Sequence, residues 1–168
     1  MTTVEAALAS LQAAGGLAAA VSVYNAEAAH DGNPIAVPAA YYKGQSDNLA
    51  AGGFPSVEVY IGHGDLTRFP QGYGEADSLD RIVVIVTDEH GTGDVETLYE
   101  KIVGLGEATI QVLVVPDAFG PQVEVESVSY DYALVQQSDP SDPMSRDVQG
   151  YRTSAVLEFR VAGVVAFG

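Results

Sequence analysis

The side chains best suited to chemistry lie in the segment TDEHGTGD, residues 87–94, which directly follows the apolar run 82–86. Carboxylates suit Mg2+ or Ca2+ and imidazole suits transition metals. The candidate ligands are Asp88, Glu89, His90, Asp94 and Glu96. Their spacing matches no known metal cage, and it lacks the order of acids, glycine and closing glutamate that an EF-hand needs.

The same segment has a simpler structural interpretation. Thr92 or Asp94 can cap a helix, acids in the first turn suit the positive end of the helix dipole, and the glycines provide the turn. We therefore interpret residues 87–94 as a loop between a strand and a helix, and expect no metal and no other cofactor. The alternative is a metal-dependent enzyme centred on this loop, which would lose tight divalent-ion binding on His90→Ala.

Other catalytic signatures give no stronger indication. His63 and Asp65 in GHGD suggest a His-Asp base, but no serine lies in a G-x-S-x-G nucleophile elbow, and HExxH and GxxxxGK are both missing from the sequence. The chain has no cysteine, which excludes thiolate chemistry. We predict that the protein is not an enzyme.

Composition indicates a single acidic domain. The 168 residues are 47% hydrophobic, and 23 acids against 7 Lys plus Arg give a net charge of -16. Specific DNA binding is disfavoured, because affinity for phosphates comes from clustered Lys and Arg. The acidity fits either solubility through self-repulsion or a host that lives at high salt. The N-terminal residues carry an acid and no Lys or Arg, and the apolar runs are short, so we expect neither a signal peptide nor a membrane anchor.

The N-terminal third combines helical spacing with a long irregular segment. Apolar residues at helical spacing predict a helix over 3–14, which Gly15-Gly16 interrupts. Residues 17–24 fit a second helix or a strand. Residues 31–53 hold two prolines and four glycines with little periodicity, so we expect them to be irregular.

The rest of the chain, residues 54–165, is expected to form a core of sheet and helix. FPSVEVYIG, residues 54–62, alternates as a half-buried strand, and a glycine-rich loop follows. Residues 81–87 are apolar on both faces, which is typical of a central strand covered on each side. Residues 95–103 have the single apolar stripe of a helix, whereas 107–115 fit either a helix turn or a strand.

Two long alternating segments close the chain. Residues 122–135 alternate, with Val123, Val125 and Val128 on one side of an expected bulge and then Tyr130, Tyr132 and Leu134. Residues 151–165 alternate as well. The polar connector between them, residues 136–150, is rich in Pro and Asp that oppose regular pairing, so we expect a long hairpin with an extended tip. The predicted fold is α+β, with a mainly antiparallel sheet flanked by helices.

Tyrosine is frequent, with nine residues, and three of them lie on the closing strands: Tyr130, Tyr132 and Tyr151. A platform for stacking nucleic-acid bases would need neighbouring basic residues. Tyrosine is also favoured at protein interfaces, where one end is apolar and the other accepts water, and it equally covers sheet faces. We keep both interpretations, assembly surface and sheet cover.

The order of these elements resembles a known viral family. An N-terminal helix, a variable loop, strands at FPSVEVYIG and DRIVVIVT, a helix at VETLYEKIVGL and the closing hairpin are similar to the tail terminator and tail-completion proteins of long-tailed double-stranded DNA phages and related archaeal viruses. The resemblance spans roughly residues 54–165 and rests on order and length rather than on a motif.

The resemblance implies a structural virion protein of the tail and neck, assembled in the host cytoplasm. Such a protein forms a ring, usually of six subunits, that caps the tail tube, ends its polymerisation and joins it to the head-tail connector or neck protein. Genome DNA would pass through without specific binding, and no membrane is involved. Another head-tail connector or a tail tube protein is the alternative within the virion.

On this hypothesis the subunit and partner contacts lie on the closing hairpin and on the loop from Asn33 to Asn48. The predicted interface residues, with the three tyrosines above, are Asp139, Asp142, Met144, Arg146, Arg152 and Arg160. Arg152 and Arg160 could pair with acids of a neighbouring subunit or with acids across strands of their own sheet.

Overall fold

The computed structural model describes the chain in seven stretches: 3–27, 34–44, 53–68, 75–90, 95–115, 122–139 and 142–166. Within these stretches, the side chains of some residues lie outside the described part: 63–68, 75–79, 90, 95, 122, 132–139, 142–151 and 163–166. The elements are α1 (Thr3–Gln12), α2 (Leu17–Ala26), β1 (Ala40–Lys43), β2 (Ser56–Arg68), β3 (Glu75–His90), α3 (Val95–Leu113), β4 (Gln122–Asp139) and β5 (Asp142–Ala166).

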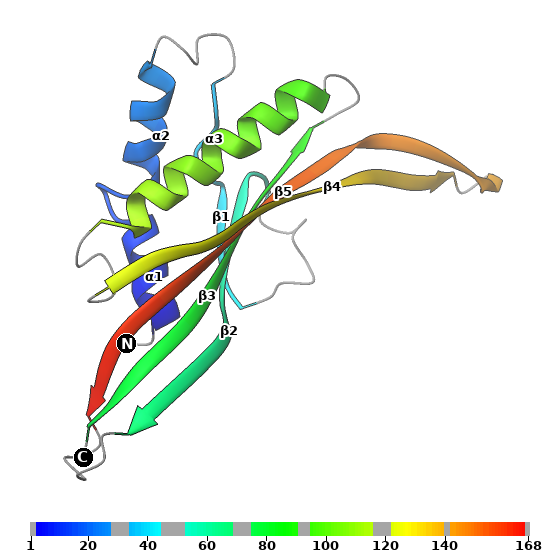
Figure 1. Ribbon diagram of the computed structural model, residues 1–168. Helices are drawn as coiled ribbons and strands as arrows, with labels where there is room; N and C mark the ends of the chain where they lie inside the picture. The colour runs from blue at the N-terminus through cyan, green and yellow to red at the C-terminus, as the bar shows by residue number, and fades with distance from the viewer. Residues whose placement is uncertain are drawn as a thin grey trace.

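The five strands form one sheet in the order β1-β2-β3-β5-β4. β1 runs parallel to β2, and the other three pairings are antiparallel. With three helices against this sheet, the predicted α+β class with a mainly antiparallel sheet is confirmed, and β4 and β5 form the expected C-terminal hairpin (Figure 1).

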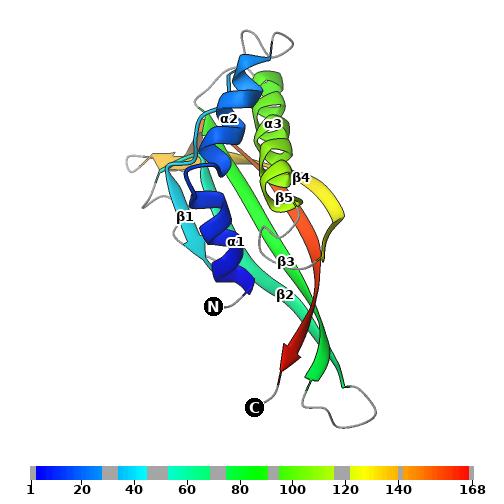
Figure 2. The same cartoon turned by 90° about the vertical axis from the view of Figure 1, so that its left-hand side faces the viewer.

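The three helices lie together on one face of the sheet (Figure 2). α1 and α3 contact the strands directly, whereas α2 packs mainly against α3. The core forms between these layers, because alternate residues of β2, β3 and β5 point toward the helices and are buried, among them Val57, Val84, Leu157 and Phe159. On the opposite face, which no described helix covers, Val83 is still only 7% exposed.

The helices differ from the predicted boundaries at two points. α1 ends at Gln12 rather than at residue 14, and α2 follows at an angle of 45°. A Cβ at Gly16 would collide with the backbone carbonyl of Ser10, so only glycine fits at this break. Residues 17–24 are helical, since Leu17 and Val21 lie one turn apart and are both buried.

α3 continues to Leu113, which decides the ambiguity over 107–115 in favour of helix. Its buried residues keep one stripe throughout: Leu98, Ile102, Leu105, Ala108 and Leu113. Gly106 lies at the closest approach to the sheet, where an added Cβ would stand 3.4 Å from Cβ of Ala155.

Several strands extend into segments predicted to be loops. β1 lies inside the segment 31–53 that we expected to be irregular, and it is too short, at 4 residues, to show a period. β2 and β3 pair through Arg68 and Ala76, well into the expected glycine-rich loop. The paired ends of β2 and β3 form an arm that projects beyond the helix layer (Figure 1). Because no described helix packs there, neither face of the arm has to be apolar, and its sequence shows no hydrophobic alternation from which a strand could be predicted.

The closing hairpin is also more regular than predicted. The polar connector 136–150 was expected to oppose pairing, but β4 and β5 remain paired from Gln136 and Val148 to Asp139 and Asp142. Irregularities next to Val135 and Ser138 absorb the residues that do not fit the ladder. β4 contains a bulge, as expected for this segment, and the structure places it between Val125 and Ser127, with Glu126 as the extra residue.

No described helix is by itself long and apolar enough to cross a membrane; α1 and α2 meet that test of length and composition only as a bent pair.

Candidate assembly surfaces

The far end of the β4–β5 hairpin carries four of the predicted interface residues: Asp139, Asp142, Met144 and Arg146. Arg146 pairs with Ser138 in the ladder. The side chains of these four residues, and those of Tyr132 and Tyr151, lie outside the described part. Asp139 and Asp142 form the last described pair of the ladder. Tyr132 and Tyr151 lie nearer the core, because Tyr151 and Thr153, the partner of Tyr132, still pair with β3. The far end of the hairpin itself projects as an arm (Figure 1).

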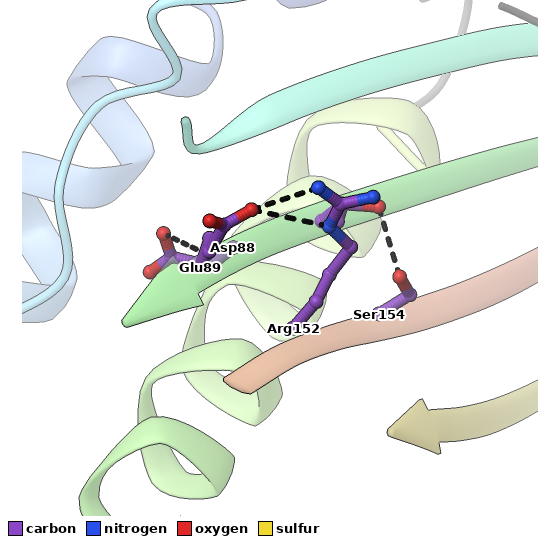
Figure 3. Close-up of polar contacts among 5 residues, drawn as sticks. Asp88, Glu89, Arg152 and Ser154 are labelled. Carbon is purple, nitrogen blue, oxygen red and sulfur yellow. Dashed lines mark hydrogen bonds and ion pairs between the residues drawn. The ribbon is translucent and has the colours of Figure 1, made fainter. Parts of the chain in front are cut away.

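Arg152 is held within its own sheet. Its Nη2 donates to Oε2 of Glu89 at 2.8 Å, and its Nε approaches the same oxygen at 3.3 Å (Figure 3). Its guanidinium also lies over the Phe54 ring, 5.0 Å from the ring centre. Next to it, the hydroxyls of Thr87 and Ser154 are 2.9 Å apart. Arg152 thus makes the cross-strand contacts that the sequence left as an alternative to a subunit contact.

Arg160 is part of a second charge cluster on the same face of the sheet. It lies directly opposite Arg81 in the β3–β5 ladder, a placement of like charges that is unfavourable without a counter-charge. The bulge residue Glu126 provides it: its two carboxylate oxygens lie 3.0 Å from Nε of Arg81 and 3.3 Å from Nη2 of Arg160. All three side chains are partly exposed, so each pair contributes about 0–1 kcal/mol.

Arg81 and Glu126 also border a shallow depression of about 330 Å3, lined by Gly62, Arg81, Val83, Glu126 and Glu158. The Ser127 hydroxyl donates to Oε2 of Glu158 at 2.7 Å. The charged groups of the depression therefore pair with one another and with their strand neighbours, which suits a structural role.

The segment that opened the sequence analysis lies partly in β3 rather than wholly in a loop. Thr87, Asp88, Glu89 and His90 are the last residues of the strand, and residues 91–94 lie outside the described part. The Asp88 carboxylate accepts a hydrogen bond from the backbone N–H of Glu89 at 2.8 Å (Figure 3). Among the described residues, no three His, Asp or Glu side chains are grouped so as to hold a metal ion.

A surface that sequence analysis did not assemble lies between α3 and β4. Tyr99 of α3 meets Tyr130 of β4 edge to face, with ring centres 5.7 Å apart. Val125 and Val128 precede Tyr130 on the helix-facing side of β4. All four are exposed, between 38% and 52%, and we call them the α3–β4 strip.

The pKa of Tyr130 is raised, first by burial and then by the neighbouring Tyr99 and Glu107. The phenol therefore stays neutral at physiological pH and keeps its O–H donor. The alternating sequence of β4 predicts that one face of this strand is apolar. Only the structure shows that the helices leave that face partly uncovered.

The sheet has two unlike edges. β4 has no described partner strand on its outer side over its 18 residues. At the other edge, β1 covers β2 only from Ser56 to Val59, so among the described strands the outer side of β2 beyond Tyr60 is also without a partner. Unpaired strand edges are ready templates for pairing with another chain.

A comparison of the sequence with known protein families finds no match, and neither does a comparison with curated proteins.

Proposed function

We propose that this chain is a structural virion protein, a tail terminator subunit that assembles into a closed ring of six, caps the tail tube and joins it to the neck. The order of the elements, which resembles that family, is now accompanied by a geometry suited to ring assembly. Catalysis plays no part in this role.

The observation that carries the proposal is the pair of sheet arms that project beyond the helix layer. One arm contains β2, the beginning of β3 and the end of β5, and the other is the far end of the β4–β5 hairpin. The two arms extend in different directions from the core (Figure 1), and their outer strands, β2 and β4, lie toward opposite edges of the sheet. A ring built from identical subunits in head-to-tail contact needs two different surfaces on each subunit. Two unlike projecting arms meet this requirement.

Charge supports the same role. The net charge of -16 disfavours adhesion of DNA, so a ring of such subunits can surround the genome without holding it.

The first experiment is light scattering coupled to size-exclusion chromatography, at low and at molar salt, with negative-stain imaging of large species. A closed ring is expected, alone or after addition of tail tubes. Filaments would instead indicate a tube protein, and a monomer that also fails to bind tubes would contradict the proposal.

A variant of the β4–β5 hairpin tests whether its tip contacts a neighbouring subunit or the tail tube. Replacing Asp139–Arg146 with a short glycine-containing turn is expected to abolish ring formation or tube binding while leaving the thermal unfolding transition of the core unchanged. The matched control, Asp139→Asn with Asp142→Asn, keeps the arm and removes only charge. Unchanged rings and tube binding in the shortened variant would show that the tip makes neither contact.

A further inference from the structure

The α3–β4 strip combines two features that each lack a partner in the described structure. Its side chains are the apolar residues Tyr99, Val125, Val128 and Tyr130, and the backbone of β4 beside them forms an open sheet edge. An extended segment that pairs with such an edge places alternate side chains over the same face. One bound strand would therefore satisfy the edge and cover the strip.

The charge around the strip is negative. β4 carries four acids and no Lys or Arg, and α3 carries three acids and one lysine. Glu124 and Asp131 are neighbours of the strip residues on β4, but the register places them on the opposite face of the sheet. Glu96 lies one turn before Tyr99, and all three acids are exposed. Exposed Glu107 is close enough to contribute to the raised pKa of Tyr130. An apolar centre with a charged rim is typical of a protein interface.

The negative charge around the α3–β4 strip indicates which kind of chain could bind there. A second copy of this chain brings a net charge of -16 with only 7 basic residues. Each described arginine side chain is already paired with a glutamate of its own sheet: Arg81, Arg152 and Arg160. Complementarity therefore favours a different, basic chain.

We propose that the α3–β4 strip is the docking site for an extended segment of a partner protein, with alternating apolar and basic residues, which adds to the outer edge of β4. The inference rests on the proposed function only for the source of the partner, which would be the tail tube or the neck protein. The surface itself is defined by exposure, edge geometry and charge.

Two labelled peptides of equal length test this, one alternating valine with lysine and the other valine with glutamate. Fluorescence anisotropy is expected to show binding of the lysine peptide alone, weaker at about 1 M than at about 0.1 M NaCl because salt screens the rim. Val128→Lys should weaken that binding at least about tenfold, because it removes an apolar contact and adds a like charge. Amide exchange should slow across residues 122–131 on binding.

The matched control is Val37→Lys, at a valine that is 46% exposed outside the strip, and it should leave binding unchanged. Equal binding of both peptides, no effect of Val128→Lys, or no slowed exchange in β4 would each overturn the inference.

Light scattering on the same samples separates the two proposals. Rings without peptide binding overturn only the docking site, and peptide binding without rings or tube binding overturns only the terminator function. Rings that Val128→Lys disrupts, with no peptide binding, would assign the strip to a second copy.

Discussion

At Gly104 of α3, the side chain of Tyr24 from α2 packs directly against the helix. A Cβ added there would stand 2.5 Å from Cζ and Oη of Tyr24, closer than non-bonded atoms allow. The ring of Tyr24 fills the space that glycine leaves, and its pKa is raised, first by burial and then by nearby glutamates. Two opposing effects act on Gly104→Ala: the better helix propensity of alanine, about 1 kcal/mol, and the displacement of Tyr24.

We predict that displacement wins and that Gly104→Ala lowers the free energy of unfolding by about 1–2 kcal/mol. In a Tyr24→Ala background the same substitution should raise it by up to about 1 kcal/mol, since only helix propensity remains. Urea denaturation of the four proteins in this double-mutant cycle gives the coupling directly. The same effect of Gly104→Ala in both backgrounds would show that Tyr24 does not press on this glycine.

At the scale of elements, one side chain fixes how the chain leaves α2. The Asn25 amide donates to the carbonyl of Ile35 and accepts from its N–H, both at 2.9 Å. Ile35 is only 4% exposed and belongs to the core. β1 follows a few residues later, so Asn25 helps to set the position from which the parallel edge strand enters the sheet.

We predict that Asn25→Asp costs about 1–3 kcal/mol of folding stability, because a carboxylate still accepts from the N–H of Ile35 but leaves its carbonyl facing a negative charge. Ser22→Asp adds the same charge to an exposed position of α2 and should cost much less. The measurement is the urea concentration at the midpoint of unfolding, compared among variants whose free energy of unfolding depends on urea with the same slope. Equal losses for the two variants would mean that charge on α2, rather than the Ile35 contact, sets the cost.

For the whole molecule, self-repulsion is the dominant electrostatic effect. The chain carries a net charge of -16, and the ion pairs in the described part are partly exposed, as Lys43–Glu5 is at 55% and 42%. Salt weakens such pairs slightly, but it screens the repulsion among the excess acids far more.

We therefore predict that the midpoint of thermal unfolding rises between about 0.1 and about 1 M NaCl, and equally in KCl. Glu96→Gln combined with Glu107→Gln removes two exposed charges and should reduce the rise. Calorimetry or circular dichroism measures the midpoint of thermal unfolding at each salt concentration. A midpoint that stays flat or falls with salt would show that attractive pairs outweigh the repulsion.

The sequence predicts this fold best where one face of an element is buried. The central position of β3 and the stripe of α3 both follow from apolar spacing, although described helices cover only one face of β3 (Figure 2) rather than both as expected. The outer arms of β2 and β3 do not, because they extend beyond the helix layer (Figure 1), where no described helix requires an apolar face. β1 is held by pairing to β2 and is too short to show a pattern.

The candidate surfaces are predictable only in part. The spacing of Val125, Val128 and Tyr130 indicates an apolar strand face, but whether helices cover that face depends on where the helix layer ends. In the same way, the sequence places Arg152 and Arg160 on one strand, and only the register assigns Glu89 and Glu126 to them. Contacts between elements distant in sequence decide both questions.

The β3–β5 ladder has a mechanical consequence. It pairs all 16 residues of β3 without a register shift, from Glu75 with Ala166 to His90 with Tyr151. β3 begins in one projecting arm and β5 begins in the other. A force that pulls these two beginnings apart therefore slides one strand along the other. The hydrogen bonds of the ladder then resist in shear, and they must break together rather than unzip one by one. The sheet is thus built as a stiff strut between the two ends of the molecule.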